Sequence, residues 1–173
     1  AKQFDVLVIG GGPGGYVAAI RAAQLGFNTA CCESESYDDP KGEVRLGGIG
    51  LGVGGIRSAA CLQTAEHFDN ARHGFVMHGI TVDDVRIDVR TMVKRKDNIV
   101  TQLTGGIKGL FKKHKIALFK GQGRLEGAKT VVVTGDGGET KIATKNVILA
   151  TGSRPALPRV QGLPMAAHTV PGP

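Results

Sequence analysis

The chain opens with an apolar run that has the character of a buried strand. Residues 6–9 are four consecutive apolar residues, mostly β-branched, and such a run is typical of a parallel strand that is buried on both faces. A glycine-rich turn follows at 10–15, and residues 16–26 carry the pattern of a helix with a glycine at its end. A second apolar run at 29–32 closes on Glu33. The pattern therefore predicts a strand, a turn, a helix and a second strand.

Hydrophobic spacing predicts a long helix in the middle of the chain. Asp88 is a suitable N-cap for it, because its short carboxylate can accept hydrogen bonds from the first free N–H groups. Val100, Leu103, Ile107 and Leu110 then recur at spacings of three and four. We expect these four side chains to form one buried stripe along the helix.

Beyond residue 115 the pattern changes to short strands. Runs at 116–120, 130–134 and 140–142 are separated by glycine turns, which predicts a small antiparallel meander. A final apolar run at 147–150 reads as a buried strand that ends at residues 151–153. Strands that alternate with helices in this order indicate an α/β fold with a parallel sheet.

The glycine turn has the spacing of a dinucleotide-binding site. Gly10, Gly12 and Gly15 occupy the three fixed positions of G-x-G-x-x-G. These glycines permit a tight turn, a close approach of a pyrophosphate to the backbone, and close packing of the helix on its strand. The positive end of the helix then faces the phosphates. Glu33 lies 18 positions after Gly15, where the motif requires an acceptor for ribose hydroxyls.

Composition and charge bear on whether the chain spans a membrane, holds a metal or contacts nucleic acid. The 173 residues are 41% hydrophobic, which suits one soluble core, and no apolar run is long enough to span a bilayer. Three cysteines, two of them adjacent, offer neither a disulfide framework nor metal-ligand spacing, so we expect no metal site and a reducing compartment. The net charge of +7 gathers at 94–96 and 112–115. We interpret these runs as solvated helix surface, with RNA contact as a weaker alternative because no aromatic residues are interleaved for base stacking.

Domain organisation follows from the distribution of proline. Five of the seven prolines fall between residues 155 and 173, which argues against a helix or a central strand there. We expect one domain over residues 1–153 and an extended tail or truncated linker over residues 154–173.

Three segments resemble a known family. Residues 4–26, 103–113 and 145–153 are similar to the amino-terminal, flavin-binding domain of the dihydrolipoamide dehydrogenases, which are pyridine-nucleotide-disulfide oxidoreductases. The resemblance implies a Rossmann-like FAD-binding domain with a parallel sheet and a small antiparallel meander, and it implies FAD as the dinucleotide. By this resemblance the FAD contacts would be Gly10, Gly12, Gly14, Gly15, Glu33, Gly47, Gly48, Gly123, Thr151, Gly152 and Ser153.

The chain departs from the family where the family carries its chemistry. The resemblance aligns Gly50 and Gly55 with the two cysteines of the redox disulfide, and Ala59 with a lysine near the flavin. Thiol–disulfide exchange requires sulfur at both positions, so we expect no catalytic residues here. The loop after Glu33 is about eight residues longer than is usual in the family. The sequence resembles neither the nicotinamide-binding domain nor the interface domain that follow in the family.

Two functions compete on these observations. The preferred hypothesis is a degenerate, non-catalytic homologue retained as a structural or accessory subunit of a larger complex. The alternative is the FAD-binding part of an active flavin oxidoreductase that another chain completes. Because members of the family commonly work in the mitochondrial matrix or the bacterial cytoplasm, the resemblance implies the mitochondrial matrix, or otherwise the cytoplasm.

Overall fold

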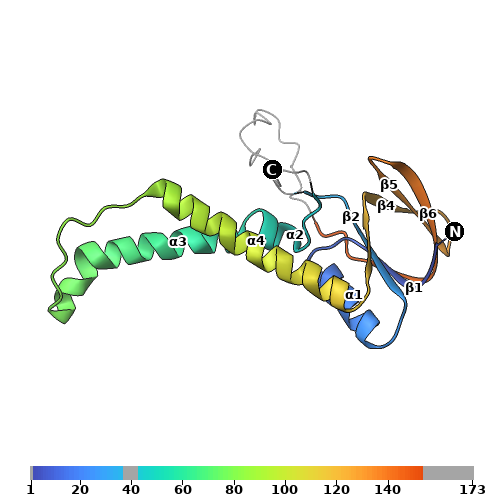
Figure 1. Cartoon of the computed structure of the whole chain (residues 1–173), viewed down its shortest axis with the longest axis horizontal. Helices are drawn as coiled ribbons and strands as arrows, with labels where there is room; N and C mark the ends of the chain where they lie inside the picture. Colours follow the sequence, from blue (N-terminus) through green and yellow to red (C-terminus); the bar gives the residue numbers. More distant parts are fainter. Residues whose placement is uncertain (1, 37–42, 154–173) are drawn as a thin grey trace, which may run out of the picture.

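One six-stranded sheet organises the fold, and helices lie on one of its faces. The structure, a computed structural model, describes residues 2–36 and 43–153 of the chain (Figure 1). The strands are ordered β3-β2-β1-β6-β5-β4. The elements in chain order are β1 (Lys2–Ile9), α1 (Pro13–Gln24), β2 (Thr29–Glu33), α2 (Gly48–Gly52), α3 (Gly55–Asp69), the π-helix η1 (Asn70–Gly74), the 3-10 helix η2 (Phe75–His78), α4 (Val89–Lys113), β3 (Ala117–Lys120), β4 (Gln122–Leu125), β5 (Thr130–Gly135) and β6 (Gly138–Leu149).

The parallel half of the sheet confirms the α/β prediction. β1 lies between β2 and β6 and runs parallel to both, with Val8 opposite Cys31 on one side and Ile148 on the other. β3 pairs in parallel with β2. The sequence interpretation was wrong to place 116–120 in the antiparallel meander, because α4 serves as a crossover that returns the chain to the parallel edge. A short apolar run does not reveal which kind of partner it will have.

The antiparallel half is formed by β4, β5 and β6. Runs at 140–142 and 147–150 were expected to be separate strands, but residues 138–149 form one continuous strand. Its first half pairs antiparallel with β5, and from Ile142 to Leu149 it pairs in parallel with β1. Polar residues between the two apolar runs resembled a break in the sequence. Thr144 is nevertheless buried, and its hydroxyl donates to the Asn146 carbonyl oxygen at 2.9 Å, so the strand continues through them.

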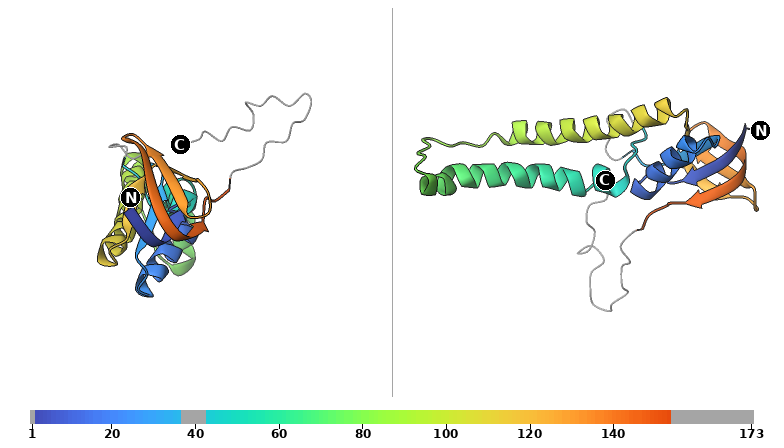
Figure 2. Two further views of the ribbon diagram at one scale, coloured as in Figure 1. Left: turned by 90° about the vertical axis from the view of Figure 1, so that its right-hand side faces the viewer. Right: turned by 90° about the horizontal axis from the view of Figure 1, so that it is seen from below.

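The sheet curls so that its two edges approach each other. β3 and β4 are at opposite ends of the strand order, yet Gly121 alone separates them in sequence. Gly121 has a φ of +137°, and its N–H donates to the Glu33 carbonyl oxygen at 2.9 Å. The chain therefore turns sharply at the end of the parallel strands, and β4 and β5 fold over them (Figure 2).

Two apolar clusters fill the two sides of the parallel strands. One joins Val6, Val8 and Cys31 to helices α1 and α4. The other joins Leu7 and Ile9 to the inward side chains of the antiparallel half. The alternation of faces along β1 explains this division, since successive strand residues point to opposite sides. Both faces of the strands that carry the glycine turn are thus fixed by packing.

Helix α4 confirms its predicted cap but corrects its predicted stripe. The Asp88 carboxylate accepts hydrogen bonds from the N–H groups of Arg90 and Thr91 at 2.9 and 3.2 Å. Leu103 and Leu110 are 42% and 41% exposed, so they do not belong to the buried stripe. The stripe that packs on the sheet and its neighbours has the regular spacing i, i+4, i+7 and i+11, and comprises Val100, Thr104, Ile107 and Phe111.

A long helical arm projects from this body. α3 and the first half of α4 run side by side away from the sheet (Figures 1 and 2). The Arg95 guanidinium joins them, because it donates to the Ala60 carbonyl oxygen at 3.2 Å and to Gln63 Oε1 at 2.7 Å. Within residues 2–36 and 43–153, no helix is long and apolar enough to cross a bilayer.

Candidate functional site

The glycine turn leaves the start of α1 open toward the carboxyl end of the sheet. Gly10 ends the first strand with a φ of +103°, and Gly12 is the N-cap of the helix. Its cap position makes no side-chain hydrogen bond, and the first turn holds no acidic residue. An uncapped helix N-terminus of this kind presents unsatisfied N–H groups and a partial positive charge. The turn can therefore bind an anion such as a pyrophosphate.

Close contacts explain why two of these positions are glycine. A Cβ atom on Gly15 would collide with the carbonyl oxygen of Gly10, and one on Gly10 would collide with the carbonyl oxygen of Ala150. Both obstacles are backbone atoms that cannot move aside easily. Gly14 has no atom within 4 Å of the corresponding position, so its side is open. The turn thus holds the helix, the strand and the end of β6 together.

Helix α2 begins directly on the glycine turn. Gly47 and Gly48 have φ angles of +119° and +62°, and the Gly47 N–H donates to the Gly11 carbonyl oxygen at 2.9 Å. A Cβ atom on Gly48 would lie only 2.8 Å from Gly12 Cα. Among the predicted site residues, the structure therefore brings Gly47 and Gly48 into contact with the turn.

Glu33 also joins this group. Its side chain is 7% exposed at the end of β2. Glu33 Oε2 accepts a hydrogen bond from the Gly11 N–H at 2.7 Å, and Oε1 accepts from the N–H groups of Ser34 and Glu35 at 2.8 and 3.1 Å. The carboxylate is therefore held against the turn, where the motif requires it.

The remaining predicted residues divide into two groups. Thr151, Gly152 and Ser153 are exposed after the end of β6, next to the turn, because the Ala150 N–H donates to the Ile9 carbonyl oxygen at 2.8 Å. Gly123 is different, since a Cβ atom there would lie 2.5 Å from Cys32 Sγ. The structure accordingly gives Gly123 a packing role within β4, three residues in sequence from Lys120, the strand partner of Glu33.

Sequence reasoning missed two residues of the site. Gly11 donates to Glu33 and accepts from Gly47, and a Cβ atom on it would lie 2.5 Å from Leu46 Cδ2. Leu46 is 1% exposed and belongs to the core cluster under α1. The available signal was that Val44 and Leu46 are apolar at the end of an otherwise polar loop.

The positions aligned with the redox cysteines are neighbours in space. A Cβ atom built on Gly55 would lie 3.5 Å from Gly50 Cα and 2.7 Å from Gly50 O. These distances place the two positions side by side, with the Gly50 carbonyl oxygen too close to leave room for a side chain on Gly55. The fold therefore brings together the two places where the chemistry would occur, and both are glycine. The cysteines present, Cys31, Cys32 and Cys61, are free.

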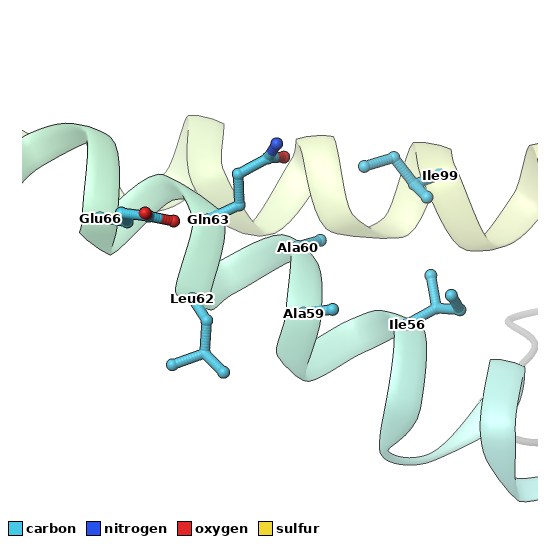
Figure 3. A pocket seen from close by; sticks show the side chains of 7 residues that line it. All are labelled: Ile56, Ala59, Ala60, Leu62, Gln63, Glu66 and Ile99. Carbon is cyan, nitrogen blue, oxygen red and sulfur yellow. The ribbon is translucent and has the colours of Figure 1, made fainter.

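An apolar groove lies along the arm between α3 and α4 (Figure 3). Its volume is about 590 Å³, and Ala59, which aligns with the family lysine, is part of its wall. Glu66 is the one charged residue among the side chains that line it, which are Ile56, Ala59, Ala60, Leu62, Gln63, Glu66 and Ile99. The groove thus offers no cation in place of the lysine. The described residues also contain no cluster of ligands that could hold a metal ion.

The buried cysteines are predicted to be unreactive in the folded protein. Burial raises the pKa of Cys31, and it raises the pKa of Cys32 from 9.0 to about 11. With a thiol reagent at pH 8 we expect only Cys61 to react rapidly, and all three cysteines to react after unfolding. The pKa of Cys32 is higher in the folded chain than in the unfolded chain, so the folded chain keeps this proton to a higher pH. The free energy of unfolding is therefore unaffected by Cys32 below pH 9 and decreases as the pH rises from 9 toward 11. Rapid labelling of Cys31 or Cys32 in the native protein would contradict this prediction.

The described structure, with its parallel strands and glycine turn, has the same fold as a solved flavoprotein. The Cu(II) complex of the HOCl-induced flavoprotein disulfide reductase RclA from Escherichia coli matches with a TM-score of 0.71 and 18% identity, covering 92% of this chain and 31% of that chain. At this identity the likeness shows the fold alone.

Sequence comparison identifies closer relatives. Dihydrolipoyl dehydrogenase of Cupriavidus necator is 55% identical over 154 residues, which are 89% of this chain and 32% of that protein. Mitochondrial dihydrolipoyl dehydrogenase 1 of Arabidopsis thaliana is 47% identical, covering 88% of this chain and 29% of that protein. The chain thus spans about a third of the length of the curated relatives it matches. A sequence profile described as pyridine nucleotide-disulphide oxidoreductase matches residues 4–171, and the chain belongs to this family.

Proposed function

We propose that this chain is an FAD-binding domain of the dihydrolipoyl dehydrogenase type that performs no dithiol chemistry and serves as an accessory part of a larger assembly. The observation that carries the proposal is the pairing of an open, uncapped glycine turn with glycine at both neighbouring redox positions, Gly50 and Gly55. The first feature retains the binding site. The second removes the sulfur atoms that the family's reaction needs.

The residues of the turn fit a dinucleotide. Gly10, Gly12 and Gly15 would approach the pyrophosphate with backbone N–H groups. Gly48 packs against Gly12 and places no side chain next to the turn. Glu33 would accept a ribose hydroxyl beside Gly11. When bound, FAD supplies a ring system that accepts and returns electrons. What these residues contribute is binding and orientation.

Loss of the dithiol supports the non-catalytic part of the proposal. Disulfide exchange proceeds by attack of a thiolate on a partner sulfur, and Gly50 and Gly55 supply neither. Cys61 lies six residues beyond Gly55 in the helical arm and is partly buried. Cys31 and Cys32 are buried in the sheet on either side of β2. No cysteine of the chain therefore replaces the missing pair.

Exposed apolar residues on the helical arm support the accessory role. Leu62, Val76 and Met77 are 69%, 73% and 88% exposed. Large apolar side chains exposed along a projecting element favour contact with another chain. The test is native purification with measurement of the particle mass. The proposal expects a particle larger than one chain that contains a different protein, and a monomer without any partner would overturn the accessory role.

The same preparation distinguishes the alternative function. If NADH reduces flavin in the purified particle, the chain is the FAD-binding part of an active oxidoreductase completed by another chain. If the flavin stays oxidised, the accessory role is supported. The mitochondrial location also stays a prediction, because the Arabidopsis relative is named mitochondrial and the Cupriavidus relative is bacterial.

A further inference from the structure

Helix α4 carries a second row of residues directly beside its buried stripe. Each member lies one position before a member of that stripe, so the spacing i, i+4, i+7 and i+11 is the same and the members share one face of the helix. The row comprises Ile99, Leu103, Gly106 and Leu110. Leu103 and Leu110 are 42% and 41% exposed, although the solvent face of a helix is normally polar. We call these four positions the exposed row.

The exposed row runs into the groove of the arm. Ile99 lines this groove from α4, and Ile56 and Leu62 line it from α3 (Figure 3). A Cβ atom built on Gly106 would have nothing within 4 Å, so a neighbour can approach the α4 backbone closely there. Two helices side by side form a groove that receives the side-chain ridge of another helix. The shape of the surface therefore suits a third helix.

The two ends of this surface carry opposite charges. Glu66 lines the groove at the end that lies further along α3. Lys113 is exposed in the last turn of α4, three residues after Leu110. A surface of one sign would favour a nucleic acid or an anionic membrane, and this surface has both signs. A helix with acidic residues in its first turn and basic residues in its last turn has the complementary polarity, and its own dipole favours that arrangement.

We propose that the exposed row and the arm groove together bind an amphipathic helix of a partner chain, antiparallel to α4, with acidic residues at its start and basic residues at its end. The inference rests on the proposed function and names the kind of partner. Ile56 and Ile99 line the groove from its two antiparallel helices, which gives the register of the arm. From that register, Glu66 and Lys113 are separated by about 24 helical residues, or roughly 36 Å. The partner helix has this length.

The first experiment uses two synthetic peptides of about 24 residues with one identical apolar face. One peptide has glutamates in the first turn and lysines in the last, and the other has them exchanged. We expect the full chain to bind the first peptide about tenfold more tightly at low salt, because two ion pairs replace two repulsive contacts. Fluorescence anisotropy of the labelled peptides measures both affinities, and the preference should shrink at high salt.

A double variant, Glu66→Lys with Lys113→Glu, is the control for the peptides themselves. It exchanges the charges at the two ends and leaves the net charge unchanged. Any difference in helicity between the peptides affects both proteins alike, so a change of preference reports the charges of the surface. We expect the preference to shift by about tenfold or more toward the second peptide. The same preference in both proteins, or no binding of either peptide, would overturn the inference.

The second experiment removes one apolar contact of the exposed row. Leu103→Ser should weaken binding of the first peptide by about tenfold, because a leucine side chain buried against the peptide is lost. Leu125→Ser makes the same change on β4, where the leucine is 46% exposed, and should leave the affinity within about twofold. Equal effects of the two variants would contradict docking on α4.

Sedimentation of the chain without peptide tests the competing occupant. A dimer of the chain that Leu103→Ser dissociates would overturn the inference, since a second copy would then cover the exposed row. These results are independent of the flavin site. Failure of the peptides to bind overturns the partner helix alone, whereas a natively purified monomer without a partner overturns the accessory role on which it rests.

Discussion

Gly15→Ala is expected to abolish most of the stability of this domain. The added Cβ atom would collide with the carbonyl oxygen of Gly10, which belongs to the backbone at the end of the central strand. To relieve the collision, α1 must move away from the strand and uncover the apolar cluster that includes Ala19 and Ala22. We expect a loss of about 3 kcal/mol or more in the free energy of unfolding, at the upper end of the usual cost of overpacking, because the obstacle is a backbone atom. Urea unfolding followed by circular dichroism measures it.

Gly14→Ala is the matched control for that variant. It makes the same substitution one residue earlier in the same helix, where nothing lies within 4 Å of the new Cβ atom. The free energy of unfolding should change by less than about 1 kcal/mol, and alanine's helix propensity favours a small gain. Similar losses in both variants would mean that the turn does not have the close packing described here.

The chain is expected to show no lipoamide turnover with NAD, even when it is saturated with FAD. Gly50 and Gly55 lie together where a reducible disulfide would be needed, and hydrogen can neither attack nor accept electrons as sulfur does. We expect a rate below roughly a thousandth of that of a dithiol-containing relative assayed in parallel, because the nucleophile is missing altogether. The Cupriavidus necator dihydrolipoyl dehydrogenase is a suitable comparison, at 55% identity over the shared region.

Turnover that depends on a disulfide would contradict the assignment of these two glycines to the redox positions. Restoring cysteine at both places is not a simple repair. Gly50 has open space around a new Cβ atom, whereas one on Gly55 would lie 2.7 Å from the Gly50 carbonyl oxygen. The backbone between α2 and α3 must shift before a disulfide can form there.

The sequence was sufficient to predict the elements that depend on interactions between residues close together in the chain. The glycine turn, its helix and the strand that ends at Glu33 follow from spacing alone. The Asp88 cap does so too, because capping depends on a side chain and the N–H groups two and three residues later. These predictions required no knowledge of distant contacts.

Long-range pairing determined the parts that could not be predicted. The run at 116–120 pairs in parallel with β2, although its sequence suits an antiparallel strand equally well. Thr144 is polar, yet it is buried within a strand that continues from Gly138 to Leu149. In α4 the apolar residues Leu103 and Leu110 are exposed, whereas the adjacent positions Thr104 and Phe111 are buried against the rest of the fold. In each case the deciding partner is far away in sequence.

The candidate site shows the same division. Gly10, Gly12, Gly15 and Glu33 could be named from the motif, since their spacing is fixed by the turn itself. The sequence did not reveal the hydrogen bond between Glu33 and Gly11, because residue 11 is a variable position of the motif. It also did not reveal that Gly123 packs on Cys32, because that contact depends on β4 folding across the parallel strands.

Equilibrium titration of the purified chain with FAD tests most directly whether it is a flavin-binding domain. Without a ligand, the glycine turn already has Gly48 packed against Gly12 and the Glu33 carboxylate hydrogen-bonded to Gly11. We therefore expect saturable binding of one FAD per chain, followed by quenching of flavin fluorescence, and a Tm that rises with the FAD concentration. Absence of binding at millimolar FAD, in a preparation that unfolds cooperatively, would contradict this assignment.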